Sequence, residues 1–221
     1  MDKLFIEARS NLDITLPASA LTLLPKKIAL LTTVQHAHKL EEIKKFLELN
    51  KKQVTLIKGI HSKYPGQILG CDVLTLPALD VDAFLYIGTG DFHPKELLLT
   101  QTKPVFVYNP LSGKFCQMKS ADIEKLTKRK KGALIRFLSS TNVGVIISTK
   151  PGQSNLEPAL KLKQSYPDKT FFFLVFDTID FQSLENFPFI ECFINTACPR
   201  IGYEDQINIA KPILNLDDLK R

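Results

Sequence analysis

Residues 27–33 read Lys-Ile-Ala-Leu-Leu-Thr-Thr, and residues 144–149 read Gly-Val-Ile-Ile-Ser-Thr. Such nearly continuous apolar runs, without the polar alternation of a half-exposed strand, indicate strands that are covered on both faces. Each run is followed by a segment with helical spacing of its apolar residues, over 37–49 and 157–165, and then by another apolar run. The two stretches therefore open two copies of one strand–helix–strand unit, which is typical of a parallel sheet.

The repeat continues through four expected strands in each copy. The first copy has strands over 27–33, 53–57, 83–87 and 103–108, and the second has strands over 144–149, 170–175, 192–195 and 211–216. A helix over 121–138, for which Ser120 is a suitable N-cap, joins the copies. The sequence thus predicts an α/β fold of two similar small three-layer parallel-sheet domains, over 21–118 and 119–221, the second including the linker helix.

The N-terminal segment resembles the end of a further copy. Residues 4–10 read Leu-Phe-Ile-Glu-Ala-Arg-Ser, similar to the strand and turn at 105–110. We therefore expect residues 1–20 to hold the terminal strand of a missing first domain, a remnant of a third unit. The alternative is an edge strand that belongs to the two-domain fold itself.

Composition narrows the classes of function. Of 221 residues, 44% are hydrophobic and 24% charged, which is enough apolar material for a core. The net charge of +6 suits an acidic partner, such as an RNA-bound complex, but it equally fits a protein from an organism whose proteins are rich in lysine. We expect no direct sequence-specific contact with nucleic acid. No apolar run approaches the roughly 20 residues that span a bilayer, and the first residues lack a signal-peptide pattern. We therefore expect a cytoplasmic protein without a membrane segment.

Four cysteines occur, and none forms a C-x-x-C pair. Cys198 precedes Pro199 just after an apolar run, and proline keeps the preceding residue extended, so we expect this thiol on a stiff, outward turn. Cys71 lies in a glycine-containing loop of the other copy, and we expect both thiols to face one cleft. From the residues alone, a metal-ligand role and inert thiols both stay open. Cys192 is expected in the core, and Cys116 is expected to have no special role.

Other polar and glycine residues also follow strand ends, where parallel sheets gather their ligands. The turn at 88–93, Gly-Thr-Gly-Asp-Phe-His, can bind an anion through backbone N–H groups. Gly88 and Gly90 lack the third glycine of a dinucleotide-binding motif, and the chain has no G-x-S-x-G or P-loop motif. For His36, a place in the site and a capping role are both open, and His61 is equally ambiguous.

Five short stretches together resemble the radical S-adenosylmethionine subunit of diphthamide synthase, the 2-(3-amino-3-carboxypropyl)histidine synthase family. Each stretch is weak alone, but they occur in family order over nearly the whole chain and are jointly specific. They are TTVQHAH at 32–38, PGQILGC at 65–71, IGTGDFHP at 87–94, STKPGQ at 148–153, and FPFIECFINTACPR at 187–200.

The resemblance implies an enzyme. Members of this family have three related α/β domains that each supply one cysteine to a 4Fe-4S cluster, and soft thiolates suit such clusters. By resemblance, Cys71 is the second-domain ligand and Cys198 the third-domain ligand. The open iron would bind S-adenosylmethionine, and the expected cofactor-binding residues are Gln67, Gly88, Gly90, His93 and Gln153.

The implied reaction is the first step of diphthamide biosynthesis. The bond between sulfur and Cγ of the methionine moiety breaks, and the 3-amino-3-carboxypropyl radical is added to a histidine of translation elongation factor 2. No catalytic side chain is expected, because the cofactor and cluster perform the difficult step while the protein orients them.

The sequence departs from the family pattern in its first domain, which is missing with its cysteine. Two thiolates do not make the usual three-ligand cluster, so we expect a separate polypeptide to supply the missing domain and third cysteine. Self-association into a dimer is compatible with this reading. The alternatives are a fragment of a longer protein and a degenerate, non-catalytic partner subunit or scaffold that docks elongation factor 2 or a catalytic paralogue. The presence of both Cys71 and Cys198 argues against the scaffold, because a scaffold needs neither.

Overall fold

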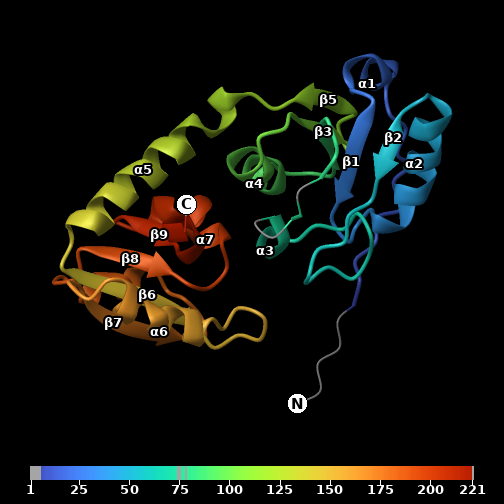
Figure 1. The fold of residues 1–221 in the computed structure, drawn as a ribbon. Helices are drawn as coiled ribbons and strands as arrows, with labels where there is room; N and C mark the ends of the chain where they lie inside the picture. The colour runs from blue at the N-terminus through green and yellow to red at the C-terminus, as the bar shows by residue number, and fades with distance from the viewer. Residues whose placement is uncertain (1–5, 74–75, 78, 221) are drawn as a thin grey trace. The chain divides into compact units, whose positions relative to one another are not determined.

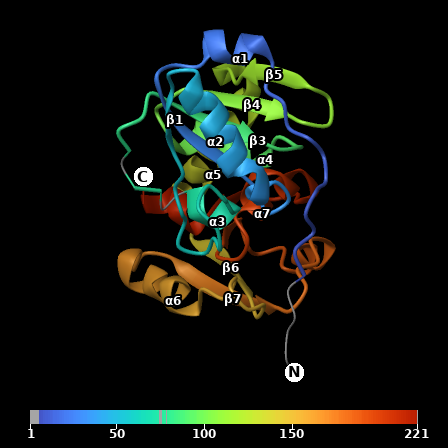
Figure 2. The same ribbon diagram turned by 90° about the vertical axis from the view of Figure 1, so that its right-hand side faces the viewer.

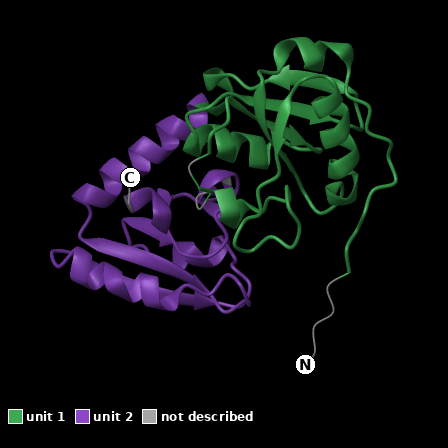
Figure 3. Ribbon diagram, turned by 45° about the vertical axis from the view of Figure 1, so that its right-hand side comes forward, with its two compact units in different colours: residues 1–123 green, residues 124–221 purple. Residues whose placement is uncertain are grey.

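The computed structural model describes residues 6–73, 76–77 and 79–220. The chain divides into two compact units, Met1–Ile123 and Glu124–Arg221, which Figure 3 shows in different colours. The division falls five residues after the boundary predicted at 118/119. In the described residues, no helix combines the length and apolar character that a bilayer-crossing segment requires.

The first unit is built on a five-stranded sheet. Its strands are β1 (Lys27–Thr32), β2 (Gln53–Thr55), β3 (Ala83–Ile87), β4 (Val105–Asn109) and β5 (Lys114–Gln117). The strand order is β2-β1-β3-β4-β5, and β1 to β4 run parallel (Figure 1). The strands predicted from the apolar runs are therefore present, with ends that shift by one or two residues.

The predicted parallel strands are joined at one edge of this unit by an antiparallel strand that was not predicted. β5 pairs antiparallel with β4, which places Cys116 opposite Val107. A tight turn makes this hairpin possible, since Asn109 Oδ1 accepts hydrogen bonds from the N–H groups of Leu111 and Ser112, and Gly113 adopts a positive φ of 67°. Cys116, for which no special role is expected, thus lies in an edge strand.

Helices cover both faces of the first sheet. On one face lie α1 (Ala18–Leu23) and α2 (Leu40–Leu49), preceded by the short 3-10 helix η1 (Ala37–Lys39); Figure 2 looks onto this face, with α2 across the strands. On the other face lie α3 (Gly70–Val73) and α4 (Phe92–Thr100). Successive β1 residues alternate between the two buried clusters, so the strand is apolar throughout because both faces are covered.

The second unit repeats the strand order of the first. Its sheet has β6 (Asn142–Ser148), β7 (Thr170–Phe176), β8 (Cys192–Asn195) and β9 (Ile213–Asn215) in the order β7-β6-β8-β9, and all neighbours are parallel. Matching β6 to β1, β7 to β2, β8 to β3 and β9 to β4 gives the same order, β2-β1-β3-β4, in the first unit. The order of strands in space thus follows the repeat that the sequence predicts along the chain.

The second sheet is also covered on both faces. On one face α5 (Glu124–Ser139) and α6 (Leu156–Ser165) pack on the strands through Ala133, Phe137, Ala159 and Leu162. On the other face lie η3 (Gln182–Asn186) and α7 (Arg200–Tyr203), while η4 (Asp205–Asn208) and η5 (Leu216–Lys220) flank β9 in sequence. The expected helix over 121–138 is split, because Ser120 opens the short η2 (Ser120–Ile123) and α5 begins at Glu124.

The predicted N-terminal strand over 4–10 is wrong for its described part. Residues 6–10 form no strand, and Leu4 and Phe5 lie outside the described residues. The backbone N–H of Ser10 instead bonds the carbonyl of Gln35, and Glu7 binds Lys63 and Tyr64. Further along the predicted terminal segment, Leu16 and Ala20 are buried in the core of the first unit.

Candidate functional site

Cys71 lies on a short helical turn, α3, where the sequence predicted a loop. The turn packs closely on the start of α4, because a Cβ on Gly70 would come within 2.9 Å of Phe92 Cε1. Ile68, two residues before the turn, and Val73, its last residue, are buried in the core. These contacts fix the backbone around Cys71, while the thiol itself is half-buried and accessible to a ligand.

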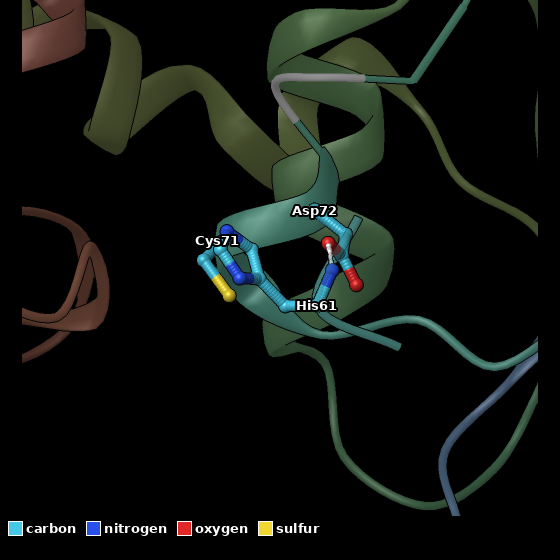
Figure 4. A group of neighbouring side chains, drawn as sticks. All are labelled: His61, Cys71 and Asp72. Carbon is cyan, nitrogen blue, oxygen red and sulfur yellow. Dashed lines mark hydrogen bonds between the residues drawn. The ribbon is translucent and has the colours of Figure 1, made fainter. Parts of the chain in front are cut away.

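A loop wraps around the residue after Cys71. Asp72 is fully buried and accepts hydrogen bonds from the backbone N–H of His61, at 2.8 Å, and from the hydroxyl of Ser62. The approach is so close that a Cβ on Gly59 would lie 2.3 Å from Asp72 Cγ. As a result, one ligand atom from each of His61, Cys71 and Asp72 lies within 4.8 Å of the other two, and Figure 4 shows the His61 ring beside Cys71.

Gln67 attaches this loop to the sheet. Its side-chain Oε1 accepts the N–H groups of Lys63 and Tyr64, both at 3.0 Å. Its neighbours pair with the end of β1, since Thr32 N–H donates to Gly66 O and Ile68 N–H donates to Thr32 O, each at 2.8 Å. The predicted cofactor-binding residue therefore has a clear positioning role, with its carbonyl oxygen engaged in holding the loop.

The glycine turn lies next to the Cys71 turn. Phe92, which Gly70 contacts, is edge-on to His93, and the His93 ring stacks on Tyr86 with centroids 5.8 Å apart. A Cβ on Gly88 would meet the Tyr86 hydroxyl at 2.7 Å, so only glycine fits there. Gly90 adopts a positive φ of 82°. The structure thus brings Gly88, His93 and the Cys71 turn together within the first unit.

Tyr86 is a buried polar group at the floor of this turn. Its side chain is fully buried, and its hydroxyl has no hydrogen-bond partner among the described residues. Burial raises the pKa of Tyr86 to about 12, because the phenolate would lose its hydration. The group is therefore neutral at physiological pH, and it can donate a hydrogen bond only to an atom that reaches this site.

His36 is buried rather than exposed at a helix start. It sits one residue before η1, and its Nδ1 has no hydrogen-bond partner among the described residues. Burial, and to a smaller degree the charge of His38, lowers the pKa of His36. The imidazole is therefore neutral at physiological pH, and of the two roles left open, capping is not supported because no side-chain cap hydrogen bond is formed.

Cys198 lies just past the carboxyl end of β8 on a rigid turn. Asn195 is buried and donates to Cys198 O at 2.9 Å and to Asn215 Oδ1 at 2.7 Å, while its own Oδ1 accepts the N–H of Ala197 at 3.0 Å. Asn215, from the neighbouring β9, donates to Pro199 O at 2.9 Å. Two asparagines on adjacent strands therefore hold the carbonyls on either side of the Cys198–Pro199 bond, and the thiol is left half-buried.

The loop that carries Gln153 joins this turn. Gly152 has a positive φ of 78°, and the N–H of Gln153 bonds Lys150 O. Asn155 Nδ2 donates to Thr196 O at 2.6 Å, which ties the loop after β6 to the loop after β8. Gln153 and Cys198 are thus carried by linked loops at the carboxyl edge of the second sheet, where parallel sheets bind ligands.

The two remaining cysteines lie elsewhere. Cys192 is 1% exposed in the core of the second unit, as expected, and burial raises the pKa of its thiol. Cys116 is half-buried in β5 and packs against the core of the first unit. Neither lies at the carboxyl edge of a parallel strand, so Cys71 and Cys198 remain the two candidates for a ligand role.

The family model described as "Putative diphthamide synthesis protein" matches residues 1–220. The chain belongs to this diphthamide synthesis family. The 2-(3-amino-3-carboxypropyl)histidine synthase of Pyrococcus horikoshii is 32% identical over 195 residues, covering 86% of this chain and 55% of that protein. The corresponding synthase of Methanocaldococcus jannaschii is 33% identical over 195 residues, and the match covers 82% of this chain and 56% of that protein.

The structural comparison agrees with this family assignment. The crystal structure of Dph2 from P. horikoshii with a 4Fe-4S cluster has a TM-score of 0.80 and 28% sequence identity, covering 91% of this chain and 58% of that one. The resemblance found in the sequence and the mixed α/β fold with parallel sheets are therefore confirmed. The chain spans about half the length of the curated relatives it matches.

The residues that hold the two thiols in place were not among those predicted from the sequence. Asp72 directly follows Cys71, and Asn195 lies three residues before Cys198. Both are next to or within the family-like stretches that carry the cysteines, but neither was predicted to have a role. Their significance comes from partners far along the chain, such as Asn215 for Asn195. The available signal was a polar residue beside both apolar residues and a candidate ligand, because such a residue must find hydrogen-bond partners once the fold buries it.

Proposed function

We propose that this chain carries two ligands of a 4Fe-4S cluster, Cys71 and Cys198, in an enzyme of the first step of diphthamide biosynthesis. The enzyme transfers the 3-amino-3-carboxypropyl group from S-adenosylmethionine to a histidine of translation elongation factor 2. The carrying observation is that each thiol lies half-buried near the carboxyl ends of the parallel strands of its own unit, Cys71 on the connection between β2 and β3 and Cys198 directly after β8, in a chain of this family.

The donor set fits the cluster. Both thiols are half-buried on turns whose backbones are fixed by buried side chains, Asp72 in one unit and Asn195 in the other. Thiolates are the ligands that iron–sulfur clusters take, and a third is needed from residues outside these 221, on the same or another polypeptide. The cluster, when bound, supplies the electron that cleaves the sulfur–carbon bond of S-adenosylmethionine.

We assign the cofactor-binding role to the carboxyl edges around these thiols. The turn of Gly88 and Gly90 opens α4 and offers backbone N–H groups close to the Cys71 turn, with His93 fixed against Tyr86. Gln67 acts by holding the Cys71 loop, and Gln153 is carried by the loop that Asn155 ties to Thr196. Since the acceptor is a translation factor, we place the enzyme in the cytoplasm.

The test is cluster content in single-cysteine variants, using protein purified anaerobically from its own host so that the source of the third thiolate is retained. Cys71→Ala and Cys198→Ala are each expected to lose most bound iron and sulfide. Cys116→Ala is the matched control, because this half-buried thiol lies away from both turns. Full iron and sulfide in both ligand variants would refute the assignment.

The same preparations distinguish an enzyme from a scaffold. Transfer of labelled aminocarboxypropyl from S-adenosylmethionine to elongation factor 2 is expected in the wild type and the Cys116→Ala variant, and not in either ligand variant. If the wild-type protein from this anaerobic preparation holds no iron and transfers nothing, yet binds elongation factor 2, and if anaerobic reconstitution with iron and sulfide restores no transfer, the scaffold is favoured instead.

A further inference from the structure

The residues around Cys71 form a donor group that the proposed cluster does not use. His61 contributes an imidazole, Cys71 a thiol and Asp72 a carboxylate, and one ligand atom from each lies within 4.8 Å of the other two. All three come from a single unit and from one segment of the chain. A cluster ligand in this family requires only the thiol, so the other two groups call for a separate explanation.

The spacing is suited to one metal ion. Metal bonds of about 2.0–2.3 Å with tetrahedral angles place ligand atoms roughly 3.3–3.8 Å apart. Rotation of the His61 and Cys71 side chains can bring their ligand atoms from within 4.8 Å to this spacing around the buried Asp72 carboxylate. The His61 backbone is already fixed by the 2.8 Å hydrogen bond to Asp72 Oδ1. The backbone therefore needs no rearrangement to bring the three donors onto one cation.

The chemistry of the donors selects the cation. A thiolate, an imidazole and a carboxylate together match divalent ions of borderline softness, such as Fe2+ and Zn2+, rather than Mg2+ or Ca2+. Asp72 is buried and accepts hydrogen bonds from His61 and Ser62, so its carboxylate is held in place beside the other two donors. Three protein donors leave one position of a four-coordinate ion open, and the exposed His61 and half-buried Cys71 give solvent access to it, as in sites that exchange or react rather than purely structural ones.

We propose that His61, Cys71 and Asp72 form a mononuclear site for a divalent cation of the Fe2+ class, which works without Cys198. Resting on the function proposed above, the site receives the first iron at Cys71 before the cluster is complete. His61 and Asp72 then leave the iron as sulfide and the other thiolates replace them, with no change of oxidation state in this exchange. The proton of Cys71 is released to solvent when the metal binds.

The experiment is anaerobic titration of the metal-free, reduced full chain with Co2+ alone, followed by absorption spectroscopy. One equivalent is expected to produce a near-ultraviolet sulfur-to-cobalt charge-transfer band together with visible bands of four-coordinate Co2+. Cys71→Ser is expected to lose the charge-transfer band, and His61→Ala to weaken binding at least about tenfold. Because His61 is exposed, this variant is not expected to impair folding.

Two controls make the outcome decisive. His38→Ala removes another exposed histidine of the same unit, and Cys198→Ser removes the candidate thiol of the other unit; both are expected to bind Co2+ as the wild type does. Wild-type affinity in His61→Ala, loss of the band in Cys198→Ser, or no band in the wild type would each overturn the proposal.

Cluster content separates this inference from the proposed function. His61→Ala that loses Co2+ binding but retains iron and sulfide after full reconstitution supports both. Ligand variants Cys71→Ala and Cys198→Ala that keep their full cluster would refute the proposed function without altering the Co2+ result.

Discussion

Replacing Asn195 by alanine tests whether the paired asparagines hold the Cys198 turn. The side chain makes three hydrogen bonds, to Cys198 O, Asn215 Oδ1 and Ala197 N–H, and it is 2% exposed. At about 0.5–1.5 kcal/mol for each net hydrogen bond, the loss comes to about 1.5–4.5 kcal/mol in the free energy of unfolding. Part of this loss arises because buried acceptors are left without a donor.

The assay is urea unfolding of the full chain followed by far-ultraviolet circular dichroism. Asn155→Ala is the matched control, because this exposed asparagine makes one hydrogen bond to the same turn, to Thr196 O, and should cost only about 0.5–1 kcal/mol. Since the two units can unfold separately, the change is expected in the transition of the second unit.

Thiol labelling gives an independent measurement on the same proteins. With its carbonyl released, Cys198 is expected to react faster with an alkylating reagent in Asn195→Ala, while Cys71 in the other unit keeps its rate. A loss of stability below about 1 kcal/mol, together with an unchanged Cys198 rate, would show that the asparagines do not hold the turn.

Two further predictions concern single groups. The pKa of Glu7 lies at about 2, because Lys63 first, then Tyr64 and Arg9, donate hydrogen bonds to its carboxylate; any stability it contributes is therefore present above its ordinary pKa of 4.5 and lost as the pH falls towards about 2. An NMR titration should find this low value in the wild type and a value nearer the ordinary one in Lys63→Ala, and equal values would contradict the contact. Tyr86→Phe should change the free energy of unfolding by less than about 0.5 kcal/mol, because its hydroxyl has no partner among the described residues. A loss above about 1.5 kcal/mol in thermal or urea unfolding would mean that the hydroxyl is bonded after all.

The sequence was most informative where a local pattern determines structure. The apolar runs predicted the parallel strands because burial on both faces leaves no room for polar alternation, as in residues 28–31. The Cys198–Pro199 pair correctly indicated a turn after β8, because proline limits the backbone locally. The hairpin of β5 was missed, since its short, half-buried strand carries no comparable apolar pattern.

The rest depends on partners that are distant in the chain. Nothing near Asn195 indicates that its amide will meet Asn215, twenty residues later on the neighbouring strand. Likewise, the helical turn that carries Cys71 forms against Phe92, which belongs to another element. The N-terminal strand was predicted from likeness to another segment, but a strand needs a partner, and Ser10 bonds a loop carbonyl instead.

The pairing of Thr32 with residues 66–68 also fixes a length of chain. Only Ile68, Leu69 and Gly70 separate Gln67 from Cys71, and Val73, just beyond, is anchored in the core. An inserted residue in this interval would displace the thiol by up to about 3.5 Å, because neither end can move to absorb it. Among chains that keep a ligand at this position, we therefore expect changes of length to occur in the segments before and after 66–73, and not within it.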